Sequence, residues 1–236
     1  MAFIRTFIFF VGYWFLTIIY GTGSAFTWLL PPLIRHKVVS SWTTAIVIWL
    51  RIACGVRYKV IGLDNLPVRG EKPVVALAKH QSAWETLYLQ SLLWPATTVL
   101  KRELLNIPFF GWGLRALNPI PIDRSNPRVA LKQVKTIGAE RIEQGYNVIL
   151  FPEGTRMKVG EKGTYARSGA DIAVTANANV IPIAHNAGHC WPPGKFTKYA
   201  GLITVSIGHP ISTEGKNTKQ VMAEVEEWIE GEMGRI

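Results

Sequence analysis

Cysteine and charge are both scarce in this chain of 236 residues. Its two cysteines, Cys54 and Cys190, exclude a scaffold stapled by several disulfides, and they cannot alone complete a cysteine-ligated zinc site. Charged residues make up 18% of the sequence and apolar residues 48%, which excludes an intrinsically disordered chain. The composition therefore predicts a folded protein with a substantial hydrophobic core.

Acidic residues are absent from the first 63 positions, where six lysines and arginines precede Asp64. Residues 64–212 carry 17 basic and 10 acidic side chains, whereas residues 213–236 carry three basic and six acidic ones. The net charge of +10 indicates an anionic partner, either nucleic acid or a membrane with anionic lipids. Because the chain opens with a long apolar stretch, we expect a lipid bilayer as partner and no nucleic acid.

The amino-terminal residues read as membrane-anchoring helices. Residues 7–34 contain no charge, and a helix of about 24 residues before Pro31-Pro32 would run about 36 Å, enough to cross a hydrocarbon core. A second apolar run, residues 38–50, is too short to span comfortably, and residues 31–37 between the runs predict a turn that carries cations. We expect residues 1–52 to form a two-helix membrane anchor and residues 53–236 a separate domain.

Several arrangements of this segment remain open. One helix can span while the other lies at the interface, or both can form a hairpin dipped into one leaflet. Cations stand at both ends and at the hinge, so the positive-inside rule gives no orientation, which favours the hairpin. Arg5 before an apolar stretch and the small residues Gly23-Ser24-Ala25 also resemble a signal peptide, and two buried core helices are a further alternative.

The remainder of the chain alternates short β-branched runs with amphipathic stretches. Residues 56–61 alternate with period two, whereas residues 73–79 contain a continuous apolar run typical of a buried strand. Further strands are expected at 97–100, 147–151, 180–184 and 202–207, and helices at 82–93, 127–144, 168–177 and 218–233. This order predicts an α/β fold with a mixed, mostly parallel sheet flanked by helices on both faces.

Unusual residues follow three of the expected strands. His80 stands just before a helix whose first turn contains Glu85, and a carboxylate on one imidazole nitrogen leaves the other free to act as a base. The alternative is a turn histidine beside a glutamate that only favours the helix start. Residues 151–156 place Gly154 between Glu153 and Arg156, where an arginine fork can hold phosphate, although a surface turn with an ion pair fits as well. At the third strand end, Lys101 and Arg124 belong to two basic loops.

Taken together, these segments resemble the glycerolipid acyltransferase superfamily, in particular its 1-acylglycerol-3-phosphate acyltransferases. Residues 80–85 are similar to the family's His-x4-Asp motif, and residues 101–124, 151–156 and 181–184 to its second, third and fourth motifs. This sequence departs from the family pattern at three positions, with Glu85 for the usual Asp, Asn118 where Gly is frequent and Arg167 where Lys is usual.

The resemblance implies transfer of an acyl chain from acyl-CoA or acyl carrier protein to the sn-2 hydroxyl of lysophosphatidic acid. The product is phosphatidic acid, a step of phospholipid biosynthesis. His80 would be the general base and Glu85 its support, with no acyl-enzyme. Glu153 would bind the glycerol or brace Arg156, and backbone N–H groups near Gly154 are candidates for oxyanion stabilisation. The residues implied in phosphate and glycerol binding are Lys101, Arg124, Glu153, Gly154, Thr155 and Arg156.

The resemblance also implies no resident cofactor and no metal, only the thioester co-substrate. His185 and His189 have a metal-like spacing, but their surroundings favour a packed loop that closes the pocket. A thioester from cytosolic metabolism places the catalytic domain on the cytoplasmic face of the inner membrane. Three rival functions remain: an acyltransferase for another lysophospholipid, a thioester hydrolase using the same His80–Glu85 pair, and a non-catalytic binder of anionic lipid.

Overall fold

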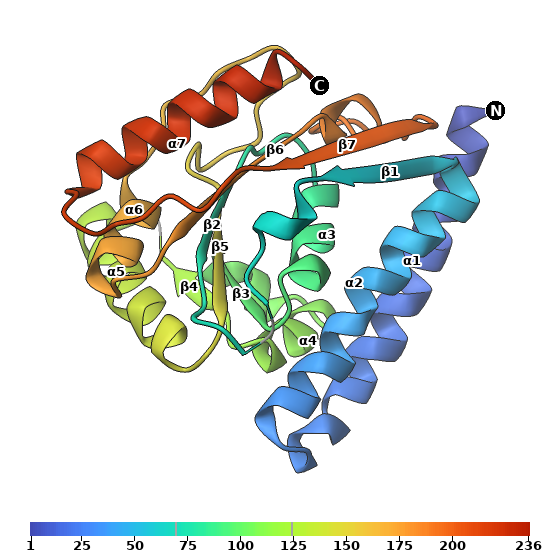
Figure 1. Cartoon of the computed structure of the whole chain (residues 1–236). Coiled ribbons are helices and arrows are strands. Elements are labelled where there is room, and N and C mark those ends of the chain that lie inside the picture. Colours follow the sequence, from blue (N-terminus) through green and yellow to red (C-terminus); the bar gives the residue numbers. More distant parts are fainter. Residues whose placement is uncertain (69, 124) are drawn as a thin grey trace.

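The computed structural model describes residues 1–68, 70–123 and 125–236 (Figure 1). Its strands are β1 (Val56–Ile61), β2 (Val75–Ala78), β3 (Ala96–Lys101), β4 (Ile120–Ile122), β5 (Asn147–Leu150), β6 (Val180–His185) and β7 (Gly201–Ile207). Its helices are α1 (Ala2–Ser24), α2 (Pro32–Cys54), α3 (Trp84–Leu92), α4 (Phe110–Ala116), α5 (Pro127–Glu143), α6 (Ser168–Thr175) and α7 (Thr218–Met233).

The strands form one seven-stranded sheet in the order β1-β7-β6-β2-β5-β3-β4. The five strands from β6 to β4 are parallel, whereas β7 pairs antiparallel with β6 and parallel with β1. The predicted mixed, mostly parallel sheet is therefore confirmed. Of the helices and strands, α4 and β4 were missed because the stretch between Lys101 and Arg124 was interpreted only as basic loops.

Both faces of the central strands are buried, and successive residues point to opposite faces. Val75 and Leu77 of β2 pack on the side of α5, α6 and α7, whereas Ala76 and Ala78 face α2 and α3. Figure 1 shows these two helical layers on either side of the sheet. The side chains of such a strand alternate between two covered faces, so its sequence is a continuous apolar run.

The N-terminal helices differ from the prediction at the turn between them. Helix α2 begins at Pro32. Proline suits the first helical position because an N–H group there would have no intrahelical acceptor. The expected turn at 31–37 is therefore wrong. Arg35 and His36 lie inside α2 and are buried, with Arg35 over the Trp28 ring and His36 Nε2 2.8 Å from the carbonyl oxygen of Ala96. These polar side chains face the protein, so they do not interrupt the helix.

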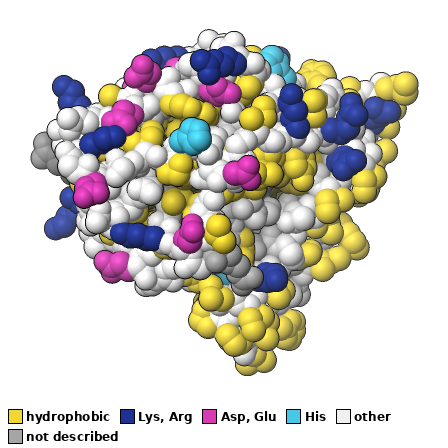
Figure 2. Space-filling view, in the orientation of Figure 1, with side chains coloured by type: hydrophobic (Ala, Val, Ile, Leu, Met, Phe, Trp, Pro, Cys, Tyr) yellow, Lys and Arg dark blue, Asp and Glu magenta, His cyan; other side chains and the backbone are white. Residues whose placement is uncertain are grey.

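Helices α1 and α2 pack against each other and leave a broad apolar surface uncovered. Trp49 Nε1 donates to the carbonyl of Phe9 at 3.0 Å, and Gly12 makes room for the Trp49 ring. By length and composition, the segments Ala2–Leu29 and Pro32–Cys54 could each cross a membrane. Apolar side chains gather along the right side and lower tip of the molecule in Figure 2, over these two helices. The most exposed large ones in α1 include Phe3, Ile4, Phe7, Val11, Trp14 and Phe15.

Candidate active site

The site lies where the chain leaves two neighbouring parallel strands in opposite directions. β2 and β5 are adjacent, but α3 after β2 packs on one face of the sheet and α6 after β5 packs on the other. Such a divergence opens a crevice at the carboxyl ends of the strands, where ligands of α/β proteins bind. His80 follows β2 and Glu153 follows β5, so the topology brings the first and third predicted motifs together.

His80 and Glu85 form a hydrogen-bonded pair, as the sequence indicated. His80 Nδ1 lies 2.9 Å from Glu85 Oε1, and the same oxygen accepts the backbone N–H groups of Gln81 at 3.0 Å and Ser82 at 2.7 Å. Helix α3 begins at Trp84, two residues later than predicted, yet Ser82 Oγ still accepts the Trp84 N–H. The longer glutamate therefore both fixes the backbone between His80 and α3 and orients the imidazole.

The Glu85 carboxyl is fully buried, and burial alone would raise its pKa. Interaction with the nearby His185 imidazole, the hydrogen bond from His80 and the N–H of Ser82 outweigh that cost and lower the pKa below its usual value. A carboxylate is only an acceptor, so His80 Nδ1 carries the proton and Nε2 is left as the acceptor. The Phe151 ring stacks on the imidazole at 4.2 Å and 20°. His80 is therefore held in the tautomer that a general base requires.

A second histidine supports this arrangement from behind. His185 is the last residue of β6, so the strand continues one residue further than predicted and His185 is not in a loop. Its Nδ1 accepts the Ala187 N–H at 3.2 Å, and its Nε2 donates to the Lys79 carbonyl at 2.7 Å. Burial lowers the pKa of His185, although the Glu85 carboxylate 3.9 Å away opposes that effect. His185 is thus a neutral structural neighbour of the pair.

Glu153 points inward from the loop after β5. Its Oε1 lies 2.7 Å from Lys79 Nζ, its Oε2 accepts the His80 N–H at 2.8 Å, and its side chain has no exposed surface. Gly154 adopts a positive φ of 66°, which glycine allows without strain, and its N–H donates to the Phe151 carbonyl at 2.9 Å. The carboxylate therefore binds protein groups. Its predicted contact with glycerol stays a prediction and would require those groups to be exchanged.

The remaining predicted anion-binding residues that the structure describes have exposed side chains or backbone. Thr155 and Arg156 are exposed, and the Arg156 guanidinium lies within electrostatic range of the Tyr13 hydroxyl of α1. Lys101 ends β3 and is exposed. Arg124 lies outside the described residues. Arg156 thus interacts electrostatically with α1.

The other two departures from the family pattern, Asn118 and Arg167, fit their local backbone and surroundings. Asn118 adopts a positive φ of 49°, a conformation that asparagine tolerates better than most residues and that glycine adopts freely. Its side-chain amide donates to the Tyr146 hydroxyl at 3.0 Å. Arg167 stands immediately before α6 and is exposed. Neither residue disturbs the geometry around His80.

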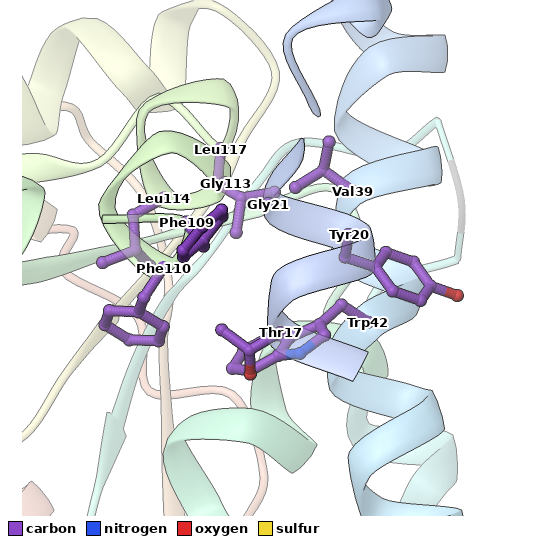
Figure 3. Close-up of a pocket in the computed structure, with 10 residues that line it drawn as sticks. All are labelled: Thr17, Tyr20, Gly21, Val39, Trp42, Phe109, Phe110, Gly113, Leu114 and Leu117. Atoms are coloured by element: carbon purple, nitrogen blue, oxygen red, sulfur yellow. The ribbon is translucent and has the colours of Figure 1, made fainter. Parts of the chain in front are cut away.

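A small apolar cavity of about 20 Å³ lies between α1, α2 and α4 (Figure 3). Gly21 and Gly113 approach it from α1 and α4, and Trp42 and Phe110 enclose it. That volume is close to the space of a single water molecule. The cavity marks the interface between the N-terminal helices and the residues that follow β3.

Sequence reasoning did not assign three residues that the structure brings into the site. Lys79 precedes His80 and Phe151 precedes the Pro152-Glu153 pair, so their positions beside the motifs were the available signal. Glu230 of α7 reaches Lys79 Nζ at 2.8 Å from 151 positions away, and no local pattern could indicate this contact. Within the described residues there is no group of three or more His, Cys, Asp or Glu side chains placed to hold a metal ion.

Comparisons with known proteins converge on one family. The family profile described as Acyltransferase matches residues 57–186, which include every predicted site residue. The chain is 44% identical over 229 residues to the 1-acyl-sn-glycerol-3-phosphate acyltransferase of Pseudomonas aeruginosa, an alignment that covers 91% of this chain and 88% of that protein. The protein of the same name in Saccharomyces cerevisiae is 27% identical, with 87% and 68% of the two chains covered.

A solved structure agrees with this result at the level of fold. The crystal structure of the 1-acyl-sn-glycerophosphate (LPA) acyltransferase PlsC from Thermotoga maritima matches with a TM-score of 0.83. The match covers 99% of this chain and 95% of that chain at 23% identity. Because nearly the whole chain is covered, the shared fold includes the two N-terminal helices.

Proposed function

We propose a reaction for this chain, which belongs to the acyltransferase family: transfer of an acyl group from acyl-CoA or acyl carrier protein to the sn-2 hydroxyl of lysophosphatidic acid. The observation that carries the proposal is the buried Glu85 carboxylate bound to His80 Nδ1, at the crevice where the Glu153–Arg156 loop begins. The sequence identity to a protein named for this reaction supports the choice of acceptor.

In this reaction His80 acts as a general base. Its Nε2 takes the proton of the sn-2 hydroxyl while the hydroxyl oxygen attacks the thioester carbonyl carbon, and Glu85 stabilises the imidazolium that forms. The carbon–sulfur bond then breaks, and the imidazolium returns the proton to the leaving thiolate. The products are phosphatidic acid and the free thiol of the donor. Ser82 Oγ already accepts the Trp84 N–H, which fits a helix cap and direct transfer without an acyl-enzyme.

The acceptor's phosphate would bind the cations around the crevice. Arg156 offers a planar fork that matches phosphate oxygens, and it lies near α1, where a lipid acceptor would arrive. Lys101 and Arg124 would complete the phosphate site, with the backbone of Gly154 and Thr155 forming its loop. No resident cofactor or metal takes part in this scheme.

The same proposal places the protein on a membrane. The exposed apolar surface of α1 and α2 would lie in the bilayer as a hairpin within one leaflet, beside anionic lipids that attract the basic residues before Asp64. A donor made by cytosolic metabolism places the catalytic domain at the cytoplasmic face of the inner membrane.

The proposal is tested by separating the products of the purified protein in detergent. Lysophosphatidic acid is supplied with a long-chain acyl-CoA or acyl carrier protein, and phosphatidic acid and free fatty acid are quantified separately. We expect phosphatidic acid. Free fatty acid alone would instead show a thioester hydrolase, and faster acylation of another lysophospholipid would change the acceptor. No turnover with any lysophospholipid would favour a non-catalytic lipid binder.

A further inference from the structure

Lys79 is a buried charge directly behind the proposed base. Its side chain is 1% exposed, and its Nζ lies 2.7 Å from Glu153 Oε1 and 2.8 Å from Glu230 Oε1. Nζ also donates to the Glu161 carbonyl at 3.2 Å. A buried ammonium group is costly unless it is paired and hydrogen-bonded, and here three acceptors satisfy it. The scheme of proton transfer given above does not use this group.

The Lys79 side chain is connected to the peptide bond that carries His80. Glu153, which binds Lys79 Nζ through one oxygen, accepts the His80 N–H through the other at 2.8 Å. On the opposite side of the same peptide bond, the Lys79 carbonyl accepts the Nε2–H of His185 at 2.7 Å. Buried side chains therefore hold both polar groups of the Lys79–His80 peptide unit.

The far end of this connection lies on the C-terminal helix. Glu230 of α7 binds Lys79 Nζ, and its Oε1 also accepts the Tyr165 hydroxyl at 2.7 Å. Burial raises the pKa of Tyr165, and the hydrogen bond to Glu230 raises it further, so the hydroxyl stays a neutral donor. Helix α7 lies outside residues 57–186, which match the acyltransferase profile.

We propose that Lys79 and Glu230 are positioning residues that align the His80 imidazole through Glu153. Glu230 fixes Lys79 Nζ, Lys79 fixes the Glu153 carboxylate, and Glu153 fixes the backbone from which the imidazole extends. The far groups act only through this backbone and touch no reacting atom. The kinetic test of this inference rests on the proposed function, whereas its test by NMR of the His80 imidazole does not.

Glu230→Gln is the most direct test because it keeps an acceptor oxygen and nearly the same volume while removing the charge. We expect kcat to fall about 10- to 100-fold, the scale of a small misplacement of a catalytic group, with KM for both substrates nearly unchanged. Tyr165→Phe removes only the hydroxyl that fixes Glu230 and should give a smaller fall in kcat. The matched control is Glu226→Gln on the same helix, which breaks the surface pair with Lys162 at 2.8 Å and should leave kcat unchanged.

A second readout does not depend on turnover. In protein made with nitrogen-labelled histidine, the imidazole NMR signals of His80, assigned with His80→Gln, report its tautomer and its hydrogen bond to Glu85. These signals should move in Glu230→Gln and not in Glu226→Gln. If the wild type transfers no acyl group, the proposed function fails, whereas the NMR comparison still tests the positioning role.

The effects of substituting Lys79 and Glu230 on kcat must also be non-additive. Lys79→Met should lower kcat at least as much as Glu230→Gln, and the double variant should be no worse than Lys79→Met alone, because both act through Glu153. Unchanged kcat and unchanged His80 signals in Glu230→Gln would overturn the inference. A rise in KM at constant kcat would also overturn it, since Lys79 and Glu230 would then act on substrate binding. If Lys79→Met does not fold, the Glu230→Gln and Tyr165→Phe results decide alone.

Discussion

At the scale of single residues, the catalytic proposal depends on one carboxylate that has several partners. Glu85 Oε1 accepts three hydrogen bonds, one from His80 and two from backbone N–H groups. The extra methylene relative to the usual aspartate is accommodated because α3 begins at Trp84, which leaves the residues after His80 free to curl around the carboxylate. Glutamate at this position therefore preserves the pair.

Substitution of Glu85 by Gln should separate orientation from charge. The amide keeps the size of the side chain but cannot stabilise an imidazolium, so we expect kcat to fall about 10²- to 10⁴-fold. Steady-state kinetics with lysophosphatidic acid measures this change, and circular dichroism controls for the fold. Activity near that of the wild type would remove Glu85 from the mechanism.

His185 should make the stability of the protein depend on pH. Its pKa is lowered in the folded state, so the unfolded chain binds a proton that the folded chain does not, and stability is lost as pH falls below about 6.5. One such group contributes at most about 1.4 kcal/mol per pH unit. The free energy of unfolding, measured with urea at several pH values between 7.5 and 5, should fall less steeply with decreasing pH in His185→Gln than in the wild type. Equal slopes would show that His185 is not responsible.

At the scale of elements, most strands and helices of residues 56–236 could be predicted from the sequence. Continuous apolar runs such as the one within residues 73–79 can only be buried strands or short helix segments, and flanking turn residues decide between them. The start of α2 could not be predicted, because Arg35 and His36 read as exposed turn residues until their buried partners are known. The approach of Glu230 to Lys79 is likewise a property of tertiary structure.

The close contact of Gly12 in α1 with Trp49 in α2 gives a prediction about the packing of these two helices. A Cβ at Gly12 would lie 2.2 Å from Trp49 Nε1, so Gly12→Ala would displace the indole and break its hydrogen bond to Phe9. We expect a loss of about 1–3 kcal/mol, which lowers Tm by several degrees in a thermal scan in detergent. Gly23→Ala in the same helix meets no atom within 4 Å and should be neutral or stabilising. Equal Tm values for both variants would contradict the close packing.

At the scale of the whole molecule, the two N-terminal helices serve both the fold and the proposed membrane contact. Their inner faces belong to the same hydrophobic core as the sheet, through buried residues such as Phe9, Ile46 and Leu50. Their outer faces carry large exposed apolar side chains, and Arg156 of the crevice lies near Tyr13 of α1. The proposed site would therefore open beside the surface that contacts lipid.

A cysteine reporter distinguishes a hairpin in one leaflet from a spanning helix. The native Cys54 and Cys190 are buried, so a cysteine introduced at Phe26, which is 73% exposed at the turn, would be the reactive one. The hairpin predicts no labelling by an impermeant maleimide added outside intact spheroplasts. Labelling of a Glu214→Cys control, at an exposed position far from the turn in sequence, after lysis shows that the reagent works. Labelling of Phe26→Cys from outside would show that α1 spans the membrane.

The central claim is that His80 is the base of acyl transfer to lysophosphatidic acid. Its most direct test is the rate of phosphatidic acid formation by the wild type and by His80→Ala, measured under the same conditions with a long-chain acyl-CoA. We predict steady formation by the wild type and a rate reduced by at least about 10²-fold in the variant, whose fold is verified by its Tm. Phosphatidic acid formed at equal rates by both proteins would contradict the account.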